Sequence, residues 1–368
     1  MFGQKRIPSR EGGVEIVVEE LAKRLVNKGY SVTCFNRGGH HVAGSNFDVV
    51  KCKSYMGIKI KDVFTINYRG LAAVTSSICA SFRTAFGNYD IVHIHAEGPA
   101  FMCWLPKMMG KKVVVTIHGL DWARQKWGML ASWYIKHGEK NAVKYADEII
   151  VLSKNNKKYF SEEYGKDTIF IPNGVSRPIH KNAREIKKWH LDKNEFILYL
   201  GRIVPEKGIH YLISAFKDID TDKKLVIAGG ASDTNAYFRK LKDLAAGDER
   251  IIFTDFVQGK VLEELYSNCY MYCLPSDLEG MPLSLLEAMS YGNCCLVSNI
   301  PECTEVVEDM AVVFSKGDKD DLKRKIEYLL DNDSEVVKLK STASDYICSK
   351  YNWNDVADAT IKVYEGIK

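Results

Sequence analysis

The chain has 368 residues, of which 46% are hydrophobic and 27% charged, and its formal net charge at pH 7 is +4. This composition is ordinary for a soluble globular protein, and the chain contains no internal repeat or low-complexity tract. The length exceeds that of one ordinary domain and predicts two domains of about 100–200 residues each.

Segments with strand-like and helix-like patterns alternate through the first half of the chain. The expected helices cover residues 14–26, 71–86 and 131–145, and the expected strands cover residues 30–35, 91–95, 113–117, 148–152 and 168–171. The first three residues look like the end of one further strand. Residues 175–195 are polar, contain Pro178 and many charges, and are interpreted as a linker.

The second half begins with the apolar strand 196–200 and repeats the alternation. Further strands are expected at 224–228, 251–253, 270–274, 294–298 and 311–314, and helices at 209–216, 236–246, 261–267, 322–330 and 336–351. A last helix begins at Trp353. Strands that alternate with helices predict parallel sheets with helices on both faces, so both halves are expected to be α/β domains.

The cysteines and the apolar segments bear on the compartment. Ten cysteines are scattered without a Cys-x-x-Cys pair, and several lie in apolar runs, which favours a reducing cytosol over a disulfide framework. Neither the cysteines nor the nine histidines have the spacing of a zinc site. No N-terminal signal peptide is visible, and no apolar run reaches the ~18 residues of a spanning helix. The expected location is the cytoplasm.

The net charge conceals an asymmetry between the two halves. Residues 1–175 contain 25 Lys or Arg and 15 Asp or Glu, a net charge of +10, and the remainder carries −6. The basic half suggests a membrane surface, a lipid diphosphate or a nucleic acid as partner, unless its charges only solvate one face. No recognised nucleic-acid-binding module is present, so we expect no nucleic-acid partner.

The most informative segment covers residues 273–292 and contains two glutamates. Glu279 lies in a Gly/Pro loop after an apolar strand, and Glu287 lies on the helix that follows Pro282. Proline suits a first helical turn, where its missing N–H costs nothing. Open α/β sheets bind ligands at the carboxyl ends of their strands, and two carboxylates there are good acceptors for the hydroxyls of a sugar or a ribose. The alternative is a pair of glutamates with no shared role.

A second motif, Leu200-Gly-Arg-Ile-Val-Pro-Glu-Lys-Gly208, joins a strand to a helix. Arg202 and Lys207 flank a tight loop at the helix N-terminus, where cations, free backbone N–H groups and the positive end of the helix dipole converge. This arrangement predicts a phosphate-binding loop, and two ordinary surface cations are the alternative.

Weaker candidates lie in the first half. Gly12 and Gly13 precede a helix, where glycines let a ligand approach the backbone, although a Gly-Gly pair more often marks a turn. His118 follows a strand and is expected to point into the crevice at the sheet edge. His95, near the end of another strand, is placed to reach an acceptor. A lone histidine is more often structural than functional.

Together these segments resemble family 4 retaining glycosyltransferases, which have the GT-B fold. The resemblance covers nearly the whole chain and is most specific in the second half. It implies an α/β protein with two Rossmann-like domains whose parallel sheets face a central cleft. Residues 1–175 would form the acceptor-side domain, residues 176–351 the nucleotide-sugar-binding domain, and residues 352–368 a helix that crosses back to the first domain.

The implied activity is the transfer of a hexose-type sugar from a nucleotide-diphosphate donor by front-face displacement, with retention and with no obligatory metal or other cofactor. The resemblance assigns the donor diphosphate to Arg202 and Lys207. It assigns the transferred sugar to Glu279 and His118, so these four residues are the candidate catalytic groups. Glu287 would bind the ribose.

The resemblance carries over further positions with less specificity. The additional donor-binding candidates are Gly12, Gly13, Asn173, Gly229, Gly280, Met281, Pro282 and Leu283, and the acceptor-side candidates are His95 and Asp121. Where the family often has Glu-Gly-Phe-Gly, this chain has Glu279-Gly-Met-Pro282. The different bulk is expected to alter the choice of sugar.

Other enzyme classes fit less well. An NAD enzyme needs Gly-x-Gly-x-x-Gly between a strand and a helix, which is absent. Asp218-Ile-Asp220 has the Asp-x-Asp form of metal-dependent glycosyltransferases, but it follows a helix rather than a strand. The two glutamates and the two cations favour transfer over a UDP-sugar 2-epimerase or a PLP-dependent phosphorylase of related architecture. A non-catalytic sugar-nucleotide-binding protein remains an alternative.

The start of the chain resembles enzymes of bacterial capsular and exopolysaccharide assembly, so the expected acceptor is a glycan or a lipid-diphosphate-linked glycan. Basic and apolar side chains cluster in a short segment of the first half: Trp104, Lys107, Met108, Met109, Lys111 and Lys112. They suggest contact with the anionic inner face of the cell membrane, where each cation near the surface contributes ~1 kcal/mol.

Overall fold

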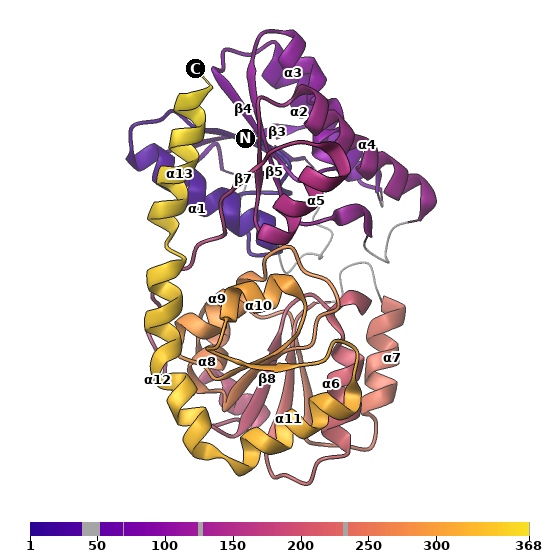
Figure 1. Ribbon diagram of the computed structural model, residues 1–368, viewed down its shortest axis with the longest axis vertical. Helices are drawn as coiled ribbons and strands as arrows, with labels where there is room; N and C mark the ends of the chain where they lie inside the picture. Colours follow the sequence, from indigo (N-terminus) through magenta and orange to yellow (C-terminus); the bar gives the residue numbers. More distant parts are fainter. Residues whose placement is uncertain (39–51, 69, 124–127, 231–234, 368) are drawn as a thin grey trace. The chain divides into compact units, whose positions relative to one another are not determined.

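The computed structural model describes residues 1–38, 52–68, 70–123, 128–230 and 235–367 (Figure 1). The chain divides into two compact units. The N-terminal unit comprises Met1–Gly174 together with Trp353–Lys368, and the C-terminal unit comprises Val175–Asn352.

Parallel strands dominate the N-terminal unit. Its described residues form a four-stranded parallel sheet of order β4-β5-β6-β7 and a three-stranded sheet of order β1-β3-β2. The strands are β1 (Thr33–Arg37), β2 (Ser54–Tyr55), β3 (Ile58–Val63), β4 (Ile91–His95), β5 (Lys112–Ile117), β6 (Glu148–Val151) and β7 (Ile169–Phe170). The helices are α1 (Gly13–Asn27), α2 (Leu71–Ala85), α3 (Trp104–Met108), α4 (Met129–Tyr145), α5 (Lys154–Tyr164) and α13 (Trp353–Gly366), with 3-10 turns η2 (Pro99–Met102) and η3 (Asp121–Ala123).

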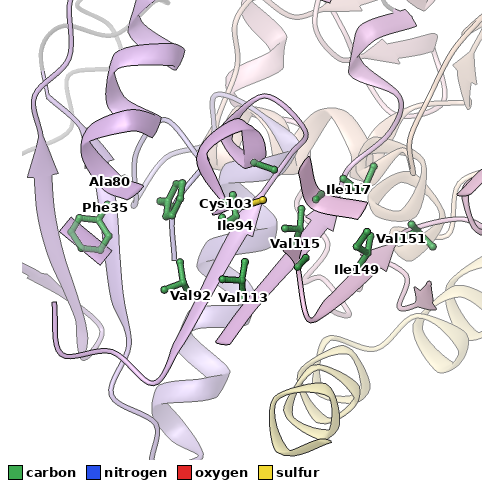
Figure 2. Close-up of a cluster of buried hydrophobic side chains, with 14 of the residues drawn as sticks. Phe35, Ala80, Val92, Ile94, Cys103, Val113, Val115, Ile117, Ile149 and Val151 are labelled. Carbon is green, nitrogen blue, oxygen red and sulfur yellow. The ribbon is translucent and has the colours of Figure 1, made fainter. Parts of the chain in front are cut away.

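The core of this unit follows from the pairing of β4, β5 and β6 (Figure 2). Because side chains alternate along a strand, Val113, Val115 and Ile117 of β5 share one face of the sheet, and they belong to the same buried cluster as Ala80 of α2. The intervening Val114 is also fully buried, as expected for a parallel sheet covered on both faces.

The first residues, which the sequence suggested are the end of a strand, lie beside β4. Phe2 forms a single parallel bridge with Ile94, and its N–H donates to the carbonyl of His93 at 3.1 Å. The N–H of Phe35 donates to the carbonyl of Met1 at 3.0 Å. The segment therefore connects β4 to β1.

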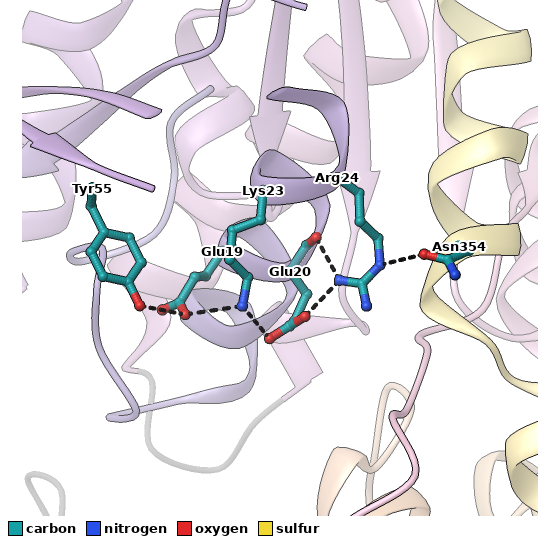
Figure 3. Close-up of polar contacts among 6 residues, drawn as sticks. All are labelled: Glu19, Glu20, Lys23, Arg24, Tyr55 and Asn354. Atoms are coloured by element: carbon teal, nitrogen blue, oxygen red, sulfur yellow. Dashed lines mark hydrogen bonds and ion pairs between the residues drawn. The ribbon is translucent and has the colours of Figure 1, made fainter. Parts of the chain in front are cut away.

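The last helix, α13, belongs to the N-terminal unit and packs along α1. The Nε of Arg24 donates to Oδ1 of Asn354 at 3.0 Å (Figure 3), and Lys28 pairs with Asp358 at 2.5 Å. Glu20, one turn before Arg24 on α1, accepts a hydrogen bond from the guanidinium at 2.6 Å. This ion pair holds the guanidinium in place beside Asn354.

The C-terminal unit contains a six-stranded parallel sheet of order β10-β9-β8-β11-β12-β13. The strands are β8 (Phe196–Leu200), β9 (Lys224–Ala228), β10 (Ile251–Asp255), β11 (Met271–Leu274), β12 (Cys295–Ser298) and β13 (Val312–Phe314). The helices are α6 (Ile209–Lys217), α7 (Asn235–Ala245), α8 (Gly259–Asn268), α9 (Leu283–Ser290), α10 (Pro301–Val307), α11 (Lys319–Asp331) and α12 (Asp333–Lys350), with 3-10 turns η4 (Glu185–Trp189) and η5 (Pro205–Lys207).

The strand order of this sheet reverses once. From β8 the chain adds β9 and β10 on one side, and it then adds β11, β12 and β13 on the other. The point between β8 and β11 is therefore a topological switch point, where open α/β sheets bind ligands beyond the carboxyl ends of their strands.

The interpretation of residues 175–195 as a linker is wrong, because the segment packs on the C-terminal unit. The N–H of Arg184 donates to Oε2 of Glu264 at 2.8 Å, and Ile186 and Leu191 are 0% and 1% exposed. Most of its polar residues face water and Val175, Ile186 and Leu191 are buried, whereas Ile179 is 76% exposed. The polar composition of this segment therefore wrongly suggested a linker.

Within the part of the chain that the structure describes, no helix combines the length and the apolar character needed to cross a membrane.

Candidate functional site

The two strongest sequence motifs lie next to each other at the switch point. Residues 201–208, here called the Arg202 loop, follow β8, and residues 275–282, here called the Glu279 loop, follow β11. Since β8 and β11 are neighbouring parallel strands, both loops leave the same edge of the sheet. The structure therefore brings together Arg202, Lys207 and Glu279, which sequence reasoning had assigned to separate motifs.

The central contact between the loops is an ion pair. The Nζ of Lys207 lies 2.5 Å from Oε1 of Glu279, and the side chains are only 12% and 7% exposed. The hydroxyl of Ser276 donates to the same Oε1 at 2.7 Å. Because nearly buried charges interact in a low dielectric, this pair holds both groups in a defined geometry at the strand ends.

Two glycines permit close backbone contacts at these loops. A Cβ on Gly229 would lie 1.8 Å from the carbonyl oxygen of Gly201. Gly208, with φ +65°, would place a Cβ 2.0 Å from the carbonyl oxygen of Pro275. Gly208 thus joins the Arg202 loop to the Glu279 loop, and Gly229, a predicted donor-binding position, supports the start of the Arg202 loop.

The remaining candidates of the Glu279 loop continue into α9. Gly280, Met281 and Pro282 are buried, and Leu283 is the first residue of α9. Pro282 is the N-cap rather than a residue of the first helical turn, one position from the prediction. Glu287 lies one turn further on, where its Oε2 is 3.3 Å from the hydroxyl of Tyr266.

The histidine candidates of the N-terminal unit form a row at the ends of β4 and β5. The Nδ1 of His95 lies 3.1 Å from Nε2 of His118, and the His95 ring stacks on His93 with centroids 4.2 Å apart. The two nitrogens of His93 lie 2.6 Å from the Tyr364 hydroxyl and 2.7 Å from Oγ1 of Thr116. His95 has no exposed surface, so in this structure its ring contacts His118 rather than solvent.

Burial and nearby positive charges govern the ionisation of these rings. Burial lowers the pKa of His93 well below its usual value, with the N-terminal amine and His118 adding to the shift. Burial also lowers the pKa of His95, with His93 and His118 adding. Both rings are therefore neutral at pH 7, and each has one donor and one acceptor nitrogen.

Asp121 belongs to the turn after His118, and this turn rests on a buried carboxyl. The N–H of Asp121 donates to Oε2 of Glu97 at 2.9 Å. Burial raises the pKa of Glu97 well above its usual range, and the carboxylates of Asp121 and Glu139 raise it further. Sequence reasoning did not identify Glu97, which looks like an ordinary loop glutamate.

Glu139 of α4 is a second residue that sequence reasoning missed. Its carboxylate is fully buried and accepts hydrogen bonds from Trp122 at 3.1 Å, Lys136 at 2.8 Å and Tyr159 at 2.9 Å, and a further short one from Tyr164. Burial would raise its pKa, but the hydrogen bonds from Glu97, Lys136 and Tyr164 lower it below the usual value. Glu139 therefore anchors the turn that carries Trp122.

Three weaker candidates lie apart from these clusters. Gly12 is the N-cap of α1 and Gly13 its first residue, and a Cβ on Gly12 would meet only the carboxylate of Glu15. Asn173 is buried in the N-terminal unit.

In the described ranges, no group of three or more His, Cys, Asp or Glu side chains is arranged to hold a metal ion.

Comparison with known proteins gives the family. Residues 181–365 match the model of the group 1 glycosyl transferases, and residues 11–177 match that of glycosyltransferase family 4. The chain belongs to this glycosyltransferase family.

The glycosyltransferase is 24% identical over 364 residues to the uncharacterized glycosyltransferase MJ1178 of Methanocaldococcus jannaschii, covering 96% of this chain and 94% of the relative. It is 24% identical over 330 residues to an uncharacterized 41.2 kDa protein in the cps region of Klebsiella pneumoniae, covering 83% and 87%. Anabaena HepE, solved in complex with UDP-glucose, superposes with a TM-score of 0.82 at 15% identity, covering 99% and 98%.

These comparisons confirm the predicted family and fold class. The solved structures that the glycosyltransferase resembles have the GT-B fold, and its own parallel sheets in two units agree with that architecture. Within the C-terminal unit, the Arg202 loop supplies cations and the Glu279 loop supplies a carboxylate. Chemically, this pairing can hold an anionic group next to a hydroxyl-bearing one.

Proposed function

We propose that this glycosyltransferase moves a sugar from a nucleotide-diphosphate donor to a glycan or lipid-diphosphate-linked glycan, with retention at the anomeric carbon, in cell-surface polysaccharide synthesis. The observation that carries the donor assignment is the meeting of the Arg202 loop and the Glu279 loop at the switch point, joined by the Lys207–Glu279 ion pair. The complex of Anabaena HepE with UDP-glucose and the relative from the Klebsiella cps region support this choice.

The proposed chemistry uses charge stabilisation rather than a protein nucleophile. The bond between the anomeric carbon and the diphosphate oxygen breaks as the acceptor oxygen bonds to the same face of that carbon. The acceptor proton passes to the departing phosphate oxygen. Arg202 and Lys207 stabilise the charge that develops on the diphosphate, an electrostatic effect worth roughly a hundredfold to a thousandfold in rate for each donor. With two fixed cations in this role, no obligatory metal is proposed.

The remaining roles are proposed from the family resemblance. Glu279 and His118 contact the transferred sugar, and Glu287 binds the ribose. Asp121 is proposed to lie on the acceptor side of the site. The contact between His95 and His118 suggests that His95 acts through His118 rather than on the acceptor.

We also propose that the enzyme works in the cytoplasm at the inner face of the membrane. On and after α3, Met108 and Met109 are 72% and 46% exposed, and Lys111 and Lys112 follow them in the sequence. Exposed apolar side chains beside cations are suited to an anionic lipid surface. Sedimentation with anionic vesicles should show binding that weakens with added salt and on Lys111→Glu with Lys112→Glu. Equal sedimentation with neutral vesicles would contradict this proposal.

A thermal-shift screen tests the donor site. UDP-, GDP-, ADP- and dTDP-sugars are added to the wild type and to the Arg202→Ala and Glu287→Ala variants. Arg177→Ala is the matched control, since Arg177 is an exposed residue of the same unit that pairs with Asp345. One nucleotide family should stabilise the wild type and the control but not the two site variants. Stabilisation by no donor would overturn the proposed function.

Turnover with the donor so identified tests the reaction class. NMR of the first-formed product should show the same anomeric configuration as the donor, and activity should persist in excess EDTA. Conversion of the donor sugar to its 2-epimer without an acceptor would instead identify an epimerase. Donor binding with no nucleotide release in the presence of any acceptor would indicate a non-catalytic binding protein.

A further inference from the structure

Three buried tyrosines of the C-terminal unit direct their hydroxyls at the bases of the two donor loops. Tyr199 lies on β8, Tyr266 on α8 and Tyr272 on β11, and all three are 0% exposed. They are the largest fully buried side chains among the described residues. Their rings fill the core, but their hydroxyl groups make contacts that packing does not require.

Tyr272 contacts both loop regions through one oxygen. Its hydroxyl lies 3.2 Å from the carbonyl oxygen of Leu200, the last residue before the Arg202 loop. It also lies 2.8 Å from Oγ of Ser284, the second residue of α9 and directly beyond the Glu279 loop. A hydroxyl can donate to the carbonyl and accept from the serine at the same time. Tyr272 therefore ties the start of one loop to the end of the other.

The other two hydroxyls reach the residues next to these anchors. Tyr199 donates to the carbonyl oxygen of Arg202 at 2.9 Å. The hydroxyl of Tyr266 lies 3.2 Å from the carbonyl oxygen of Ser284 and 3.3 Å from Oε2 of Glu287. The three contacts thus involve the backbone of one candidate phosphate ligand and the side chain of the candidate ribose ligand.

The environment makes these hydrogen bonds costly to lose. Burial raises the pKa of all three phenols well above the usual value, so they remain neutral donors. In a low-dielectric interior, a polar group that loses its hydrogen-bond partner has no water molecule to replace it. Phenylalanine would fill the same space without the hydroxyl, so the core alone does not explain tyrosine at these positions.

We propose that Tyr199, Tyr266 and Tyr272 are positioning residues of the donor site, with Tyr272 as the principal one because it bridges the two loops. Their hydroxyls hold the Arg202 loop and the N-terminus of α9 in the arrangement that binds a nucleotide sugar. The inference rests on the proposed function, and it adds residues that touch no donor atom.

The test replaces each hydroxyl by hydrogen. Tyr199→Phe, Tyr266→Phe and Tyr272→Phe are compared with Tyr270→Phe, a matched control from the same unit. Tyr270 is 5% exposed, and its hydroxyl lies 2.7 Å from both the carbonyl oxygen of Leu329 and Oδ1 of Asp333, at the junction of α11 and α12. All four variants lose a buried hydroxyl, but only three lose one that contacts Arg202, Glu287 or the residues Leu200 and Ser284 that flank the two loops.

The readouts are the melting temperature without donor, the donor-induced rise in melting temperature, and the donor KM and kcat. All four variants should melt several degrees below the wild type. Tyr272→Phe should also raise the donor KM about tenfold, since losing one buried hydrogen bond corresponds to roughly that factor. Tyr199→Phe should lower kcat more than it raises KM, because Arg202 acts on the developing charge. Tyr270→Phe should leave KM and kcat unchanged.

Two further variants, Ser284→Ala and its combination with Tyr272→Phe, distinguish positioning of the donor site from a general loss of stability. If Tyr272 acts through Ser284, Ser284→Ala should also raise the donor KM, and the double variant should be no worse than Tyr272→Phe. Wild-type KM and kcat in the three loop variants, or an equal change in Tyr270→Phe, would overturn the inference while the donor site stands. A wild type that responds to no nucleotide sugar would overturn the proposed function and this inference together.

Discussion

The two units hold their candidate residues by opposite electrostatic means. In the C-terminal unit, opposite charges meet in the Lys207–Glu279 pair. In the N-terminal unit, the candidate histidine His118 lies against neutral His95, which is itself stacked on neutral His93.

The difference fits the proposed ligands, because the C-terminal unit is assigned the charged diphosphate as well as hydroxyls, and His118 is assigned only sugar hydroxyls. The net charge of +10 over residues 1–175 is counted with neutral histidines, so the row of His93, His95 and His118 adds nothing to it.

Breaking the Lys207–Glu279 ion pair should cause the largest change in stability and in rate. Lys207→Ala leaves the carboxylate of Glu279, which is 7% exposed, without its cation. Losing one partner of a buried pair costs about 3–5 kcal/mol, and the partial exposure here places the expected loss of unfolding free energy near the lower end. The rate should fall roughly a hundredfold to a thousandfold. Urea unfolding and initial rates measure the two effects.

Two further variants separate stability from catalysis. The double variant, Lys207→Ala with Glu279→Gln, no longer has an unpaired carboxylate at position 279. Much of the lost stability should therefore return, whereas the activity should not. Lys319→Ala removes a cation paired with Asp218 on the exposed surface of the same unit. It should leave the unfolding free energy nearly unchanged, because an exposed ion pair contributes little. A stability loss in Lys207→Ala no greater than in Lys319→Ala would show that the pair is solvated.

Glycine substitutions extend the comparison to the backbone. In the C-terminal unit, Gly229→Ala would force a Cβ to 1.8 Å from the carbonyl oxygen of Gly201, and backbone atoms cannot easily move away. We expect a loss of about 1–3 kcal/mol and weaker donor binding. In the N-terminal unit, Gly12→Ala meets a side-chain atom rather than backbone, Oε2 of Glu15 at 2.6 Å. Glu15 is buried and its Oε1 accepts a hydrogen bond from the N–H of Lys5 at 2.7 Å, so it can give way only in part. The loss caused by Gly12→Ala in thermal or urea unfolding should be smaller, and a larger one would show that Glu15 is rigidly held.

The pH dependence of stability should distinguish the N-terminal unit from the C-terminal unit. His93 and His95 have folded pKa values below the unfolded value of about 6.5. The unfolded state therefore binds more protons below that pH, and stability falls as the pH drops, by up to ~1.4 kcal/mol per pH unit for each ring. Glu97, whose folded pKa is raised, acts in the opposite direction above pH ~4.5 and offsets about one ring.

The Met1 amine is also buried and its pKa is lowered from 8.0, so it acts in the same direction as the two rings up to about that pH. The stability of the N-terminal unit should therefore rise up to about pH 6.5 and change little between there and pH 8. His95→Gln should reduce the rise below pH 6.5, and Glu97→Gln should let stability continue to rise toward pH 8. Hydrogen exchange of β4 and β5 between pH 5 and 8 measures the free energy of opening of this unit. Constant stability over that range would show that these groups are accessible to water.

The sequence predicted the C-terminal sheet well because its strands are apolar runs with clear limits. The strands at 196–200 and 224–228 were predicted to the residue. Two elements that the sequence analysis missed, β3 and α5, have weaker sequence patterns that could have indicated them. In β3, Ile58 and Ile60 are buried and the lysines between and after them are exposed, a period-two pattern within a charged stretch. The polar helix α5 begins at a Ser153 cap and ends at Gly165 in the left-handed region.

The site was only partly predictable, for a physical reason. Cations and carboxylates at strand ends are visible in a local motif, so Arg202, Lys207 and Glu279 could be named. The groups that hold them are buried and distant in sequence: the Tyr272 hydroxyl contacts a carbonyl 72 positions earlier. Glu97 and Glu139 likewise act across two elements. Such contacts depend on the tertiary structure and leave no local pattern.

The smallest effects are expected at α13, where a buried and an exposed contact can be compared within one helix. Tyr364→Phe removes the hydroxyl that lies 2.6 Å from Nδ1 of buried His93, and leaving that nitrogen without a partner should cost about 1–2 kcal/mol. Asp358→Ala removes an ion pair with Lys28 whose side chains are 51% and 40% exposed. This loss should be about 0–1 kcal/mol and should vanish at high salt.

Hydrogen exchange of α13 at low and high salt measures both variants. Only Tyr364→Phe should also change the acid-side decline in stability, because the hydroxyl and the neutral ring stabilise each other. If Asp358→Ala released α13 as readily as Tyr364→Phe, the exposed ion pairs along α1 would be what attaches the helix. The buried hydrogen bond to β4 would then contribute little, and the neutral histidine row would not depend on α13.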